Sequence, residues 1–346
     1  MAVHKRLLKK YQEYINQNRN VEYYSSFESL PEVSAVHKWV GAQSIADRLY
    51  GIPNDMSVIL KYRRAAGVYL GQVGNGLFKW TGGCIWNGCL YAFPRTSNSL
   101  LKMSLDTETV EYVHLKEPYA REHHYGGICT KEGVVYQPPR DSDHLLVWDL
   151  KTEKAERIYL GSRSGDRVFR YCGSILHPDG QAYFLPESGE RVIKLNTKTR
   201  EWHFIDESVD AMVFDAKVAP DDDIYGYSAY CPGILRIDTK TDSVKMIHKE
   251  IHPGAYGTKL GVNGHLYSIP GDGNAIWDYD PLTDRLISIY NFSENFTAKY
   301  AGGASMRDGT ILAVPAREQK ILQLTVNQTN LNIPEDIYRE YFADCY

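Results

Sequence analysis

The fold is decided by the stretch Lys79-Trp80-Thr81-Gly82-Gly83-Cys84-Ile85-Trp86-Asn87-Gly88-Cys89-Leu90-Tyr91-Ala92-Phe93-Pro94. This stretch predicts two short strands joined at Asn87-Gly88, because both residues of that dipeptide tolerate the positive φ of a two-residue hairpin turn. Related stretches run from Arg170 to Pro186 and from Tyr300 to Pro315, each with an Asp-Gly turn in place of Asn-Gly. The chain is therefore built from repeats.

Two markers recur once per repeat. The first is a tyrosine shortly before a proline or its equivalent, at Tyr50, Tyr91, Tyr136, Tyr183, Tyr225, Tyr267 and, in the last copy, Leu312. The second is Asp/Asn-x-x-Thr, which begins at Asp106, Asp149, Asn196, Asp238 and Asp280. Its side-chain oxygen can accept a hydrogen bond from the backbone two residues on, which favours a turn. The markers recur every 41–47 residues, the period of a four-stranded propeller blade.

Seven copies fit between residues 36 and 325. They predict an all-β fold, a seven-bladed β-propeller of four-stranded antiparallel blades in one domain. The last copy lacks an outer strand, because the chain turns polar after Leu324. Val21-Glu22-Tyr23-Tyr24 is similar to Val110-Glu111-Tyr112-Val113, so we expect residues 20–25 to complete blade 7. That pairing would remove the open edge between the first and last blades.

Short helices are expected at both ends of residues 1–346. Residues 1–18 place Leu7, Leu8 and Tyr11 at helical spacing among lysines, which predicts an amphipathic helix. Residues 333–346 carry Pro334 at the first position of a second helix. Ring closure would bring the two helices near each other.

The run of apolar strand, Asp-Gly or Asn-Gly turn, Tyr-x-x-Pro and Asp-x-x-Thr resembles the YVTN and virginiamycin-B-lyase-like group of propellers. The resemblance extends over about residues 20–325. It implies the propeller fold, but no catalytic residue of a lyase can be matched position by position. The WD40 pattern fits less well, because Trp148-Asp149 and Trp277-Asp278 have no Gly-His partner at blade spacing.

Composition narrows the function classes. The net charge is −4, from 39 basic and 43 acidic residues, so no global excess argues for nucleic acid or an anionic membrane. The six cysteines form no Cys-x-x-Cys pair, and Asp221-Asp222-Asp223 is interpreted as a hairpin turn without calcium-loop spacing. No metal or cofactor is predicted. The N-terminal residues lack the apolar core of a secretory signal, so a cytoplasmic location is expected.

Candidate binding residues fall at one face of the predicted ring. The first strand of each blade should line the channel, and its start should open on the same face as the loop after the second strand. A basic residue followed by an aromatic one precedes the glycines in most copies. The expected ligand-binding residues are Lys38, Trp39, Lys79, Trp80, Arg95, Arg140, Tyr171, Lys299, Tyr300 and Arg317. The aromatic residues could instead pack between blades, and the basic residues could be scattered over the surface by loop geometry.

One cluster could perform acid–base chemistry. His123 and His124 follow Arg121 and Glu122, and a histidine can accept a proton near neutral pH. Arg170 in the next blade could hold a substrate carboxylate, so His123, His124 and Arg170 are the candidate catalytic residues. Two histidines in a polar loop without chemistry are the alternative interpretation.

Three hypotheses about function follow. The first is a binding module that recognises an anionic ligand, an acidic saccharide or a protein segment, in a cationic, aromatic-lined funnel. The second is a lyase-type enzyme on an anionic substrate that uses a histidine base on the same face. The third is a protein–protein interaction scaffold without a small-molecule site. The fold cannot choose among them, because propellers support all three.

Overall fold

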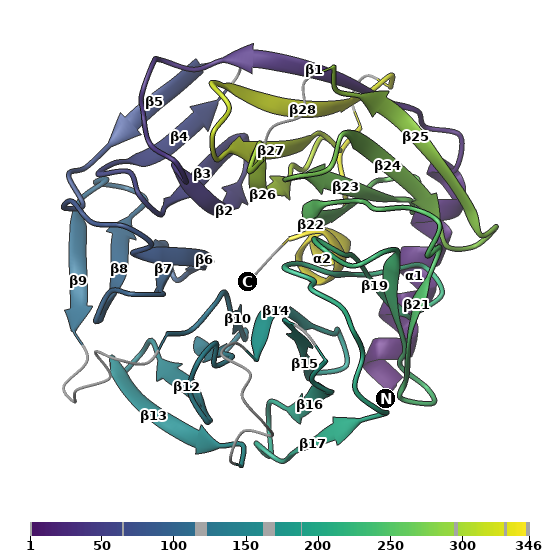
Figure 1. Ribbon diagram of the computed structural model, residues 1–346, viewed down its shortest axis with the longest axis horizontal. Helices are drawn as coiled ribbons and strands as arrows, with labels where there is room; N and C mark the ends of the chain where they lie inside the picture. Colours follow the sequence, from purple (N-terminus) through teal and green to yellow (C-terminus); the bar gives the residue numbers. More distant parts are fainter. Residues whose placement is uncertain are drawn as a thin grey trace.

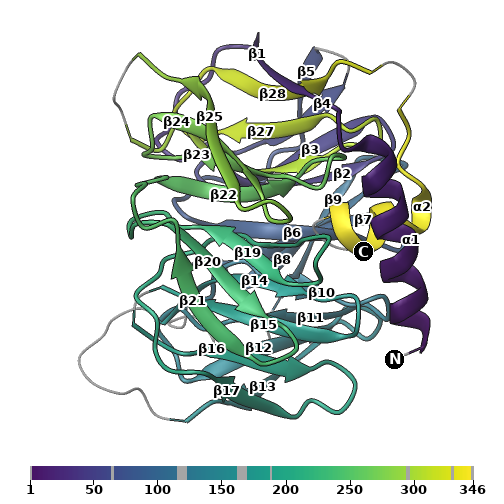
Figure 2. The same cartoon turned by 90° about the vertical axis from the view of Figure 1, so that its right-hand side faces the viewer.

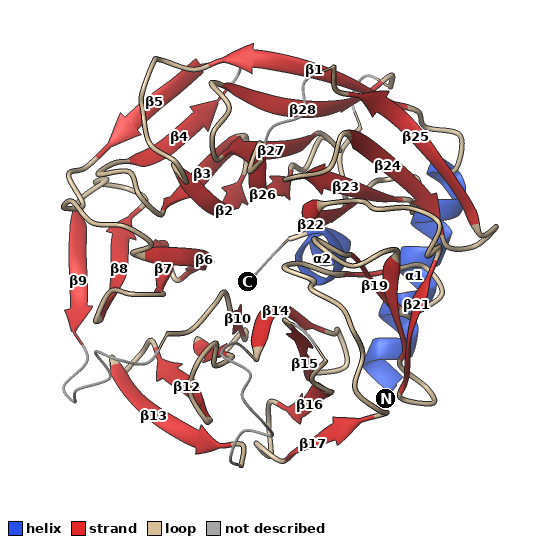
Figure 3. Cartoon of the chain, viewed as in Figure 1, coloured by secondary structure: helices blue, strands red, loops and turns tan. Residues whose placement is uncertain are grey.

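A computed structural model describes residues 2–63, 66–114, 123–161, 170–187, 189–293, 297–328 and 331–343. These residues form seven four-stranded antiparallel sheets that stand around a common axis, as Figure 1 shows. The predicted seven-bladed β-propeller is confirmed. Figure 3 shows that the ring consists of strands, with helix α1 at its edge and helix α2 near its centre.

The first three blades follow one another along the chain, each from the channel outward. Blade 1 contains β2 (Trp39–Ile45), β3 (Arg48–Pro53), β4 (Ile59–Arg63) and β5 (Ala66–Leu70). Blade 2 contains β6 (Trp80–Trp86), β7 (Cys89–Pro94), β8 (Ser99–Ser104) and β9 (Val110–His114). Blade 3 contains β10 (Ile128–Cys129), β11 (Val134–Gln137), β12 (His144–Asp149) and β13 (Lys154–Tyr159).

The next three blades repeat this order. Blade 4 contains β14 (Tyr171–Leu176), β15 (Gln181–Pro186), β16 (Val192–Asn196) and β17 (Trp202–Ile205). Blade 5 contains β18 (Lys217–Val218), β19 (Ile224–Tyr227), β20 (Ile234–Asp238) and β21 (Ser243–Ile247). Blade 6 contains β22 (Ala255–Leu260), β23 (Leu266–Pro270), β24 (Ala275–Asp280) and β25 (Arg285–Asn291).

Blade 7 is assembled from both ends of the chain. It contains β26 (Tyr300–Ser305), β27 (Ile311–Pro315), β28 (Lys320–Val326) and, outermost, β1 (Tyr23–Ser29). The pairing of β1 with β28 is antiparallel and runs without a break from Tyr23 opposite Val326 to Ser29 opposite Lys320. The predicted N-terminal closure is confirmed, although the strand begins and ends later than residues 20–25. The ring therefore has no free edge between its first and last blades.

Five inner strands carry a β-bulge near their start, namely β2, β6, β14, β22 and β26. In β6, Trp80 lies opposite Pro94 and Gly83 lies opposite Ala92, so β6 has one residue more than β7 between these pairs. The same shift occurs in β2 and β26, again at a glycine with positive φ, Gly41 and Gly302. The bulge interrupts the period-two alternation of side chains, and this decides which residues face the channel.

Both terminal segments lie on one side of the disc, as Figure 2 shows. Helix α1 (Ala2–Asn18) lies next to the short helix α2 (Glu335–Ile337) and the π-helical turn η1 (Tyr338–Phe342). The ring of Tyr11 stacks on Tyr341 with 3.8 Å between their centroids. None of the described helices is both long and apolar enough to span a membrane.

The C-terminal segment covers that end of the channel. The turn η1 contacts β18 and β22, and the hydroxyl of Tyr338 donates to the carbonyl of Ser305 in blade 7 at 2.8 Å. Tyr341 lines a cavity that shares Ser174 and Asp215 with the main channel cavity. The channel is thus accessible from the opposite face, where the inner strands begin.

Candidate binding site in the central channel

Backbone hydrogen bonds run around the open face and fix which residues of each blade are equivalent. The amide of Lys38 donates to the carbonyl of Ala316 at 3.2 Å, and the amide of Asn54 donates to the carbonyl of Lys38 at 3.0 Å. The same alternation continues through Lys79 and Arg95. In all seven blades the carbonyl of one residue near the start of the inner strand accepts a hydrogen bond from the loop after the second strand of the same blade. In blades 1, 2, 4 and 7 the amide of that residue also donates to the corresponding loop of the previous blade. We number this residue position 1 and count onward along the inner strand.

Position 1 contains the basic residues that were expected to contact a ligand, and the ammonium groups of its lysines bind backbone carbonyls instead. The ammonium group of Lys38 donates to the carbonyls of Ala316, Arg317 and Glu318 at 2.8–3.1 Å. Lys79 likewise donates to three carbonyls at 3.0 Å, two of them in blade 1. Burial lowers the pKa of Lys38 to about 8. These cations hold neighbouring blades together.

The other two basic residues at position 1 are also buried. Lys299 donates to the carbonyl of Gly273 in blade 6 at 3.2 Å. Arg170 is 2% exposed and lies 3.5 Å from Glu190 and 3.6 Å from Asp143 of blade 3. Lys38, Lys79, Arg170 and Lys299 thus have no exposed cationic group with which to contact a ligand, although the sequence suggested that role.

Position 2 contains the predicted aromatic residues, all of which lie in the core. Trp39, Trp80, Tyr171 and Tyr300 are each at most 2% exposed. Trp39 packs with Leu312 of blade 7, and Trp80 packs with Tyr50 of blade 1. Their indole N–H groups donate to carbonyls within their own blades. Of the two directions that the sequence leaves open, packing between blades is the one observed.

Position 3 lines the channel in every blade except blade 4, where Cys172 is buried, and three blades place an aromatic ring there. The residues are Tyr125 in blade 3, Phe214 in blade 5 and Tyr256 in blade 6, all half-buried. The ring of Phe214 lies 5.3 Å from Tyr125 and 5.2 Å from Tyr256, so the three rings form a continuous aromatic arc. None of these three rings is among the binding residues expected from the sequence. The signal was available, because Tyr125 and Tyr256 directly precede a glycine whereas Trp39 and Trp80 do not.

Position 4 is glycine in most blades and aspartate in blade 5. Gly41 and Gly82 pack backbone to backbone, since a Cβ on Gly41 would lie 3.0 Å from the Cα of Gly82. We call Gly257, Gly302, Gly41, Gly82 and Gly126 the glycine collar, because each of them contacts the next across a blade boundary. Asp215 takes this position in blade 5, so a carboxylate enters the channel where the collar ends.

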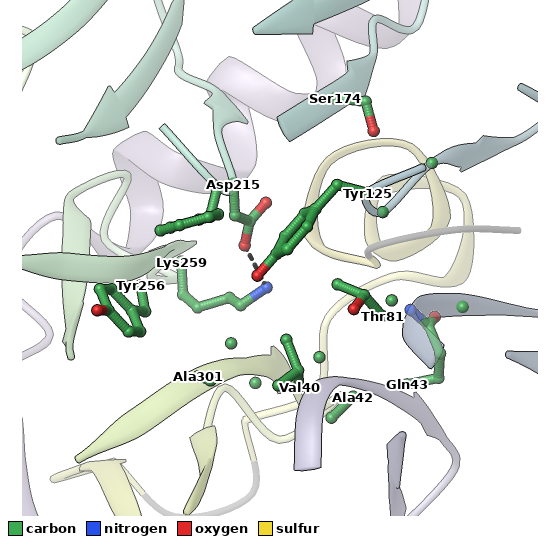
Figure 4. Close-up of a pocket in the computed structure, with 18 residues that line it drawn as sticks. Val40, Ala42, Gln43, Thr81, Tyr125, Ser174, Asp215, Tyr256, Lys259 and Ala301 are labelled. Atoms are coloured by element: carbon green, nitrogen blue, oxygen red, sulfur yellow. Dashed lines mark hydrogen bonds and ion pairs between the residues drawn. The ribbon is translucent and has the colours of Figure 1, made fainter. Parts of the chain in front are cut away.

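The channel cavity encloses about 680 Å³ of empty space, part of it open to solvent. Figure 4 shows Tyr125, Asp215, Tyr256 and Lys259 among the side chains that line it. The ammonium group of Lys259 donates to Asp215 Oδ2 at 2.6 Å. Gln43, Thr81 and Ser174 add neutral polar groups to the wall. Such a cavity combines flat apolar rings with a few polar groups, as small-molecule sites do.

Arginine side chains lie against the outer side of the aromatic arc. The guanidinium carbon of Arg95 is 5.0 Å from the ring centre of Tyr125 and 4.4 Å from that of Phe78. Arg140 also stacks on Tyr125 and makes two hydrogen bonds of 3.1 Å to the carboxylate of Glu187. Burial raises the pKa of Glu187, and Arg140 opposes this shift. The charge of Arg140 is thereby neutralised.

Arg95 differs from Arg140 in its partners. Across the described parts of the chain it makes no hydrogen bond or ion pair, and its contacts are the faces of Phe78 and Tyr125. Burial lowers its pKa, and the positive charge of Arg140 acts in the same direction. A half-buried guanidinium with unused donors is suited to a carboxylate.

The remaining predicted cation, Arg317, lies outside this arrangement. Ala316 and not Arg317 occupies the ring of backbone hydrogen bonds in blade 7. The side chain of Arg317 is exposed and donates to the hydroxyl of Thr297 at 3.1 Å.

The two predicted catalytic histidines have different environments. His124 is 3% exposed, burial lowers its pKa to about 4, and its Nε2 has no hydrogen-bond partner within the described residues. His123 is partly exposed, and its Nδ1 pairs with Asp141. Arg121 and Glu122 lie outside the described residues. The structure brings His123 near Arg140, whose amide donates to its carbonyl at 2.8 Å, while it buries His124 and Arg170.

Comparison with known proteins identifies the fold and no family. No protein-family model matches the sequence, and no curated protein matches it. Among solved structures, a streptogramin B lyase superposes with a TM-score of 0.71 at 15% identity, over 88% of this chain and 98% of that one. A catalytically inactive virginiamycin B lyase from Staphylococcus aureus, determined with quinupristin, gives 0.70 at 13% identity, over 88% and 99%.

A third similar structure is the extracellular domain of a protein described as a hybrid two-component system of B. thetaiotaomicron. Its TM-score is 0.65 at 14% identity, over 87% of this chain and 40% of that one. The TM-scores establish a propeller fold shared with lyases and with an extracellular domain. The sequence identities are too low to assign an activity.

Proposed function

We propose that the protein is a binding module that takes an acidic saccharide at the open mouth of its channel. The observation that carries this proposal is the guanidinium of Arg95, which lies against Tyr125 without a hydrogen bond or ion pair to any described residue, beside a channel-facing row of aromatic rings. An acidic saccharide combines a carboxylate with ring faces, and the two features match the arginine and the aromatic arc.

The steps of recognition follow from the geometry. The rings of Tyr125, Phe214 and Tyr256 offer flat surfaces for the apolar faces of a sugar ring. The carboxylate would meet the two donors of the Arg95 fork, which the described protein groups leave unused. Hydroxyl groups that point into the channel would meet Gln43 and the Asp215–Lys259 pair. This differs from the funnel expected from sequence, because the lysines at position 1 take no part.

Calorimetric titration with trigalacturonate, galactose and inorganic phosphate tests the proposal. We expect trigalacturonate to bind, and galactose and phosphate to bind at least tenfold more weakly. Arg95→Met should weaken trigalacturonate binding about 10–100-fold, the value of one charge-assisted interaction. Arg317→Met, which removes an exposed arginine of the same face, is the matched control and should bind as the unaltered protein does.

Other outcomes would count against it. Equal binding of phosphate and trigalacturonate would mean that the site recognises negative charge alone, and it would contradict the proposed saccharide specificity. Absence of binding by all three probes would favour the scaffold hypothesis, in which this face contacts another protein.

A lyase is the second candidate, and the His123–Asp141 pair favours it. Asp141 engages the Nδ1 of His123, which leaves Nε2 as a base toward solvent. In a β-elimination this base would remove the proton next to the carboxylate as the glycosidic oxygen departs with its electron pair. The ultraviolet absorbance of an unsaturated uronate product tests this step. Product that forms in the unaltered protein and not in His123→Asn would establish the enzyme, and no product would reject it.

A further inference from the structure

Three side chains from distant parts of the sequence meet beneath blades 4 and 5, on the face that carries helix α1. His4 comes from the first turn of α1, His177 from the turn between β14 and β15, and Asp222 from the turn between β18 and β19. The Nε2 of His4 is 3.2 Å from Asp222 Oδ2, and the Nε2 of His177 is 3.3 Å from Asp222 Oδ1. One ligand atom from each residue lies within 4.8 Å of the others.

The spacing suits a tetrahedral metal ion. With Zn–N and Zn–O bonds of about 2.0–2.1 Å, neighbouring ligand atoms in a tetrahedron lie about 3.3–3.4 Å apart. The two measured separations are close to this value before any adjustment of the side chains. Two imidazoles and one carboxylate also form a donor set that zinc accepts, with a fourth position for water.

A second carboxylate supports the cluster from behind. Asp179 Oδ1 lies 2.9 Å from the Nδ1 of His177. The backbone N–H of Asp179 also donates to this Nδ1, at 3.3 Å. Asp179 therefore holds the ring of His177 through its main chain and its carboxylate, as outer groups orient the histidine ligands of metal ions.

The cluster contains buried polar atoms that have no hydrogen-bond partner among the described residues. His177 is 2% exposed, and its Nε2 makes no hydrogen bond to any described residue. The same is true of Asp222 Oδ1, the atom that faces it. A buried polar group without a hydrogen bond is costly, and a metal ion bound between these two atoms would satisfy both.

The position of Asp222 in its turn is also unusual. It has a φ of +76°, and the equivalent turn residues in blades 3, 4, 6 and 7 are Gly133, Gly180, Gly264 and Gly309. Glycine adopts this conformation freely, whereas aspartate does so at a cost. In blade 5 the chain thus retains a carboxylate at a place where its own repeats have no side chain.

We propose that His4, His177 and Asp222 bind a transition-metal ion of the zinc class, and that this ion fastens helix α1 to blades 4 and 5. The site is separate from the channel mouth and does not depend on the saccharide proposal. Sequence analysis predicted no metal and interpreted Asp221-Asp222-Asp223 as a turn. That interpretation of the turn stands, but nothing in the spacing of His4, His177 and Asp222 along the chain indicates that they meet.

Titration with Zn²⁺, and with Co²⁺ for its visible absorption, tests the site on the protein of residues 1–346. We expect one equivalent of Zn²⁺ to bind, Co²⁺ to show the intense bands of tetrahedral coordination, and Mg²⁺ and Ca²⁺ to have no effect. Asp222→Gly should abolish binding while it keeps the turn, because glycine is the residue of the other blades. His4→Ala, a change within α1, should also abolish it.

Two further variants separate a metal site from a general effect of histidines. Asp179→Asn leaves the three ligands in place and should weaken zinc binding about 10–100-fold. His265→Ala is the matched control, because His265 lies beside Asp278 and Asp280 in blade 6 without a second histidine. It should leave zinc binding unchanged. Failure of the unaltered protein to bind Zn²⁺, or equal binding by Asp222→Gly, would overturn the proposal.

Discussion

The ammonium group of Lys38 in blade 1 donates a hydrogen bond of 3.1 Å to the carbonyl of Ala316 in blade 7. It also reaches the carbonyls of the next two residues, Arg317 and Glu318. The contact lies at the joint where the ring closes, and it uses a buried charge to satisfy the loop after the second strand of blade 7.

Removal of this charge should weaken the closed ring. We expect Lys38→Met to lower the free energy of unfolding by about 3 kcal/mol, because hydrogen bonds to a charged group contribute about 1.5–3 kcal/mol and the carbonyls would lose their donor. Urea denaturation followed by tryptophan fluorescence measures the change. Lys61→Met is the control in the same blade, since Lys61 forms a more exposed pair with Glu108 and should cost at most about 1 kcal/mol. Equal effects of the two substitutions would contradict the role assigned to Lys38.

The glycine collar gives a second prediction. Gly41 and Gly88 both have positive φ, +84° and +73°. A Cβ on Gly41 would meet the backbone of Gly82 at 3.0 Å, whereas a Cβ on Gly88 would meet nothing within 4 Å. We expect Gly88→Ala to cost about 1 kcal/mol from its backbone conformation alone. Gly41→Ala should cost about 1–3 kcal/mol more through overpacking.

Thermal unfolding of the two alanine variants checks this difference. The pair is matched, because both substitutions add the same methyl group at a left-handed position. If Gly41→Ala proved no less stable than Gly88→Ala, neighbouring blades would not be packed through these glycines.

The inner strands show which features of this protein could be predicted from its sequence and which could not. Asn87-Gly88 and Tyr91 through Pro94 indicated a strand, a turn and a strand, and their recurrence gave the number of blades and the closing strand. These features depend on local turn chemistry and on hydrophobic period, both of which are visible in one sequence. The direction of the side chains at the channel depends instead on a bulge, whose weaker sequence signal is the glycine at position 4.

In blade 2 this bulge lies between Trp80 and Gly83. The prediction placed Trp80 at the channel mouth because it precedes the glycines, but the extra residue of the bulge turns Trp80 into the core and leaves Thr81, at position 3, facing the channel. Tyr125 occupies that position in blade 3. The cluster of His4, His177 and Asp222 was out of reach for a different reason, since only the closed ring brings α1 under blades 4 and 5.

The buried histidine His124 predicts how stability depends on pH. Burial lowers its pKa from 6.5 to about 4, so the unfolded chain binds a proton that the folded protein does not between these values. Stability should therefore fall as the pH decreases from about 6.5 to 4, by about 3 kcal/mol for this group. Burial lowers the pKa of His37 as well, which acts in the same direction.

Urea denaturation at pH 4.5, 5.5 and 6.5 measures this slope. We expect His124→Gln to flatten it, because glutamine does not titrate. His203→Gln changes an exposed histidine and should leave the slope as it is. A slope that persisted in His124→Gln would assign the acid sensitivity to other groups.

A charge pair that anchors the start of the chain gives a prediction at lower pH. Both terminal nitrogens of Arg19 donate to the carboxylate of Asp280 in blade 6, just after helix α1 ends. Burial alone would raise the pKa of Asp280, but the hydrogen bonds from Arg19 and Thr283 lower it to about 2. A carboxyl group whose folded pKa is depressed stabilises the protein above its ordinary pKa and loses that contribution as the pH falls through about 2.

Arg19→Gln should therefore destabilise the protein by about 2 kcal/mol at pH 7 and by much less near pH 2, where Asp280 is protonated in both variants. Chemical denaturation at the two pH values measures the difference. Arg285→Gln removes an exposed arginine from the neighbouring strand β25 and is expected to have little effect at either pH. A loss in Arg19→Gln that stayed the same at pH 2 would mean that Arg19 acts through packing of its side chain, and not through the charge of Asp280.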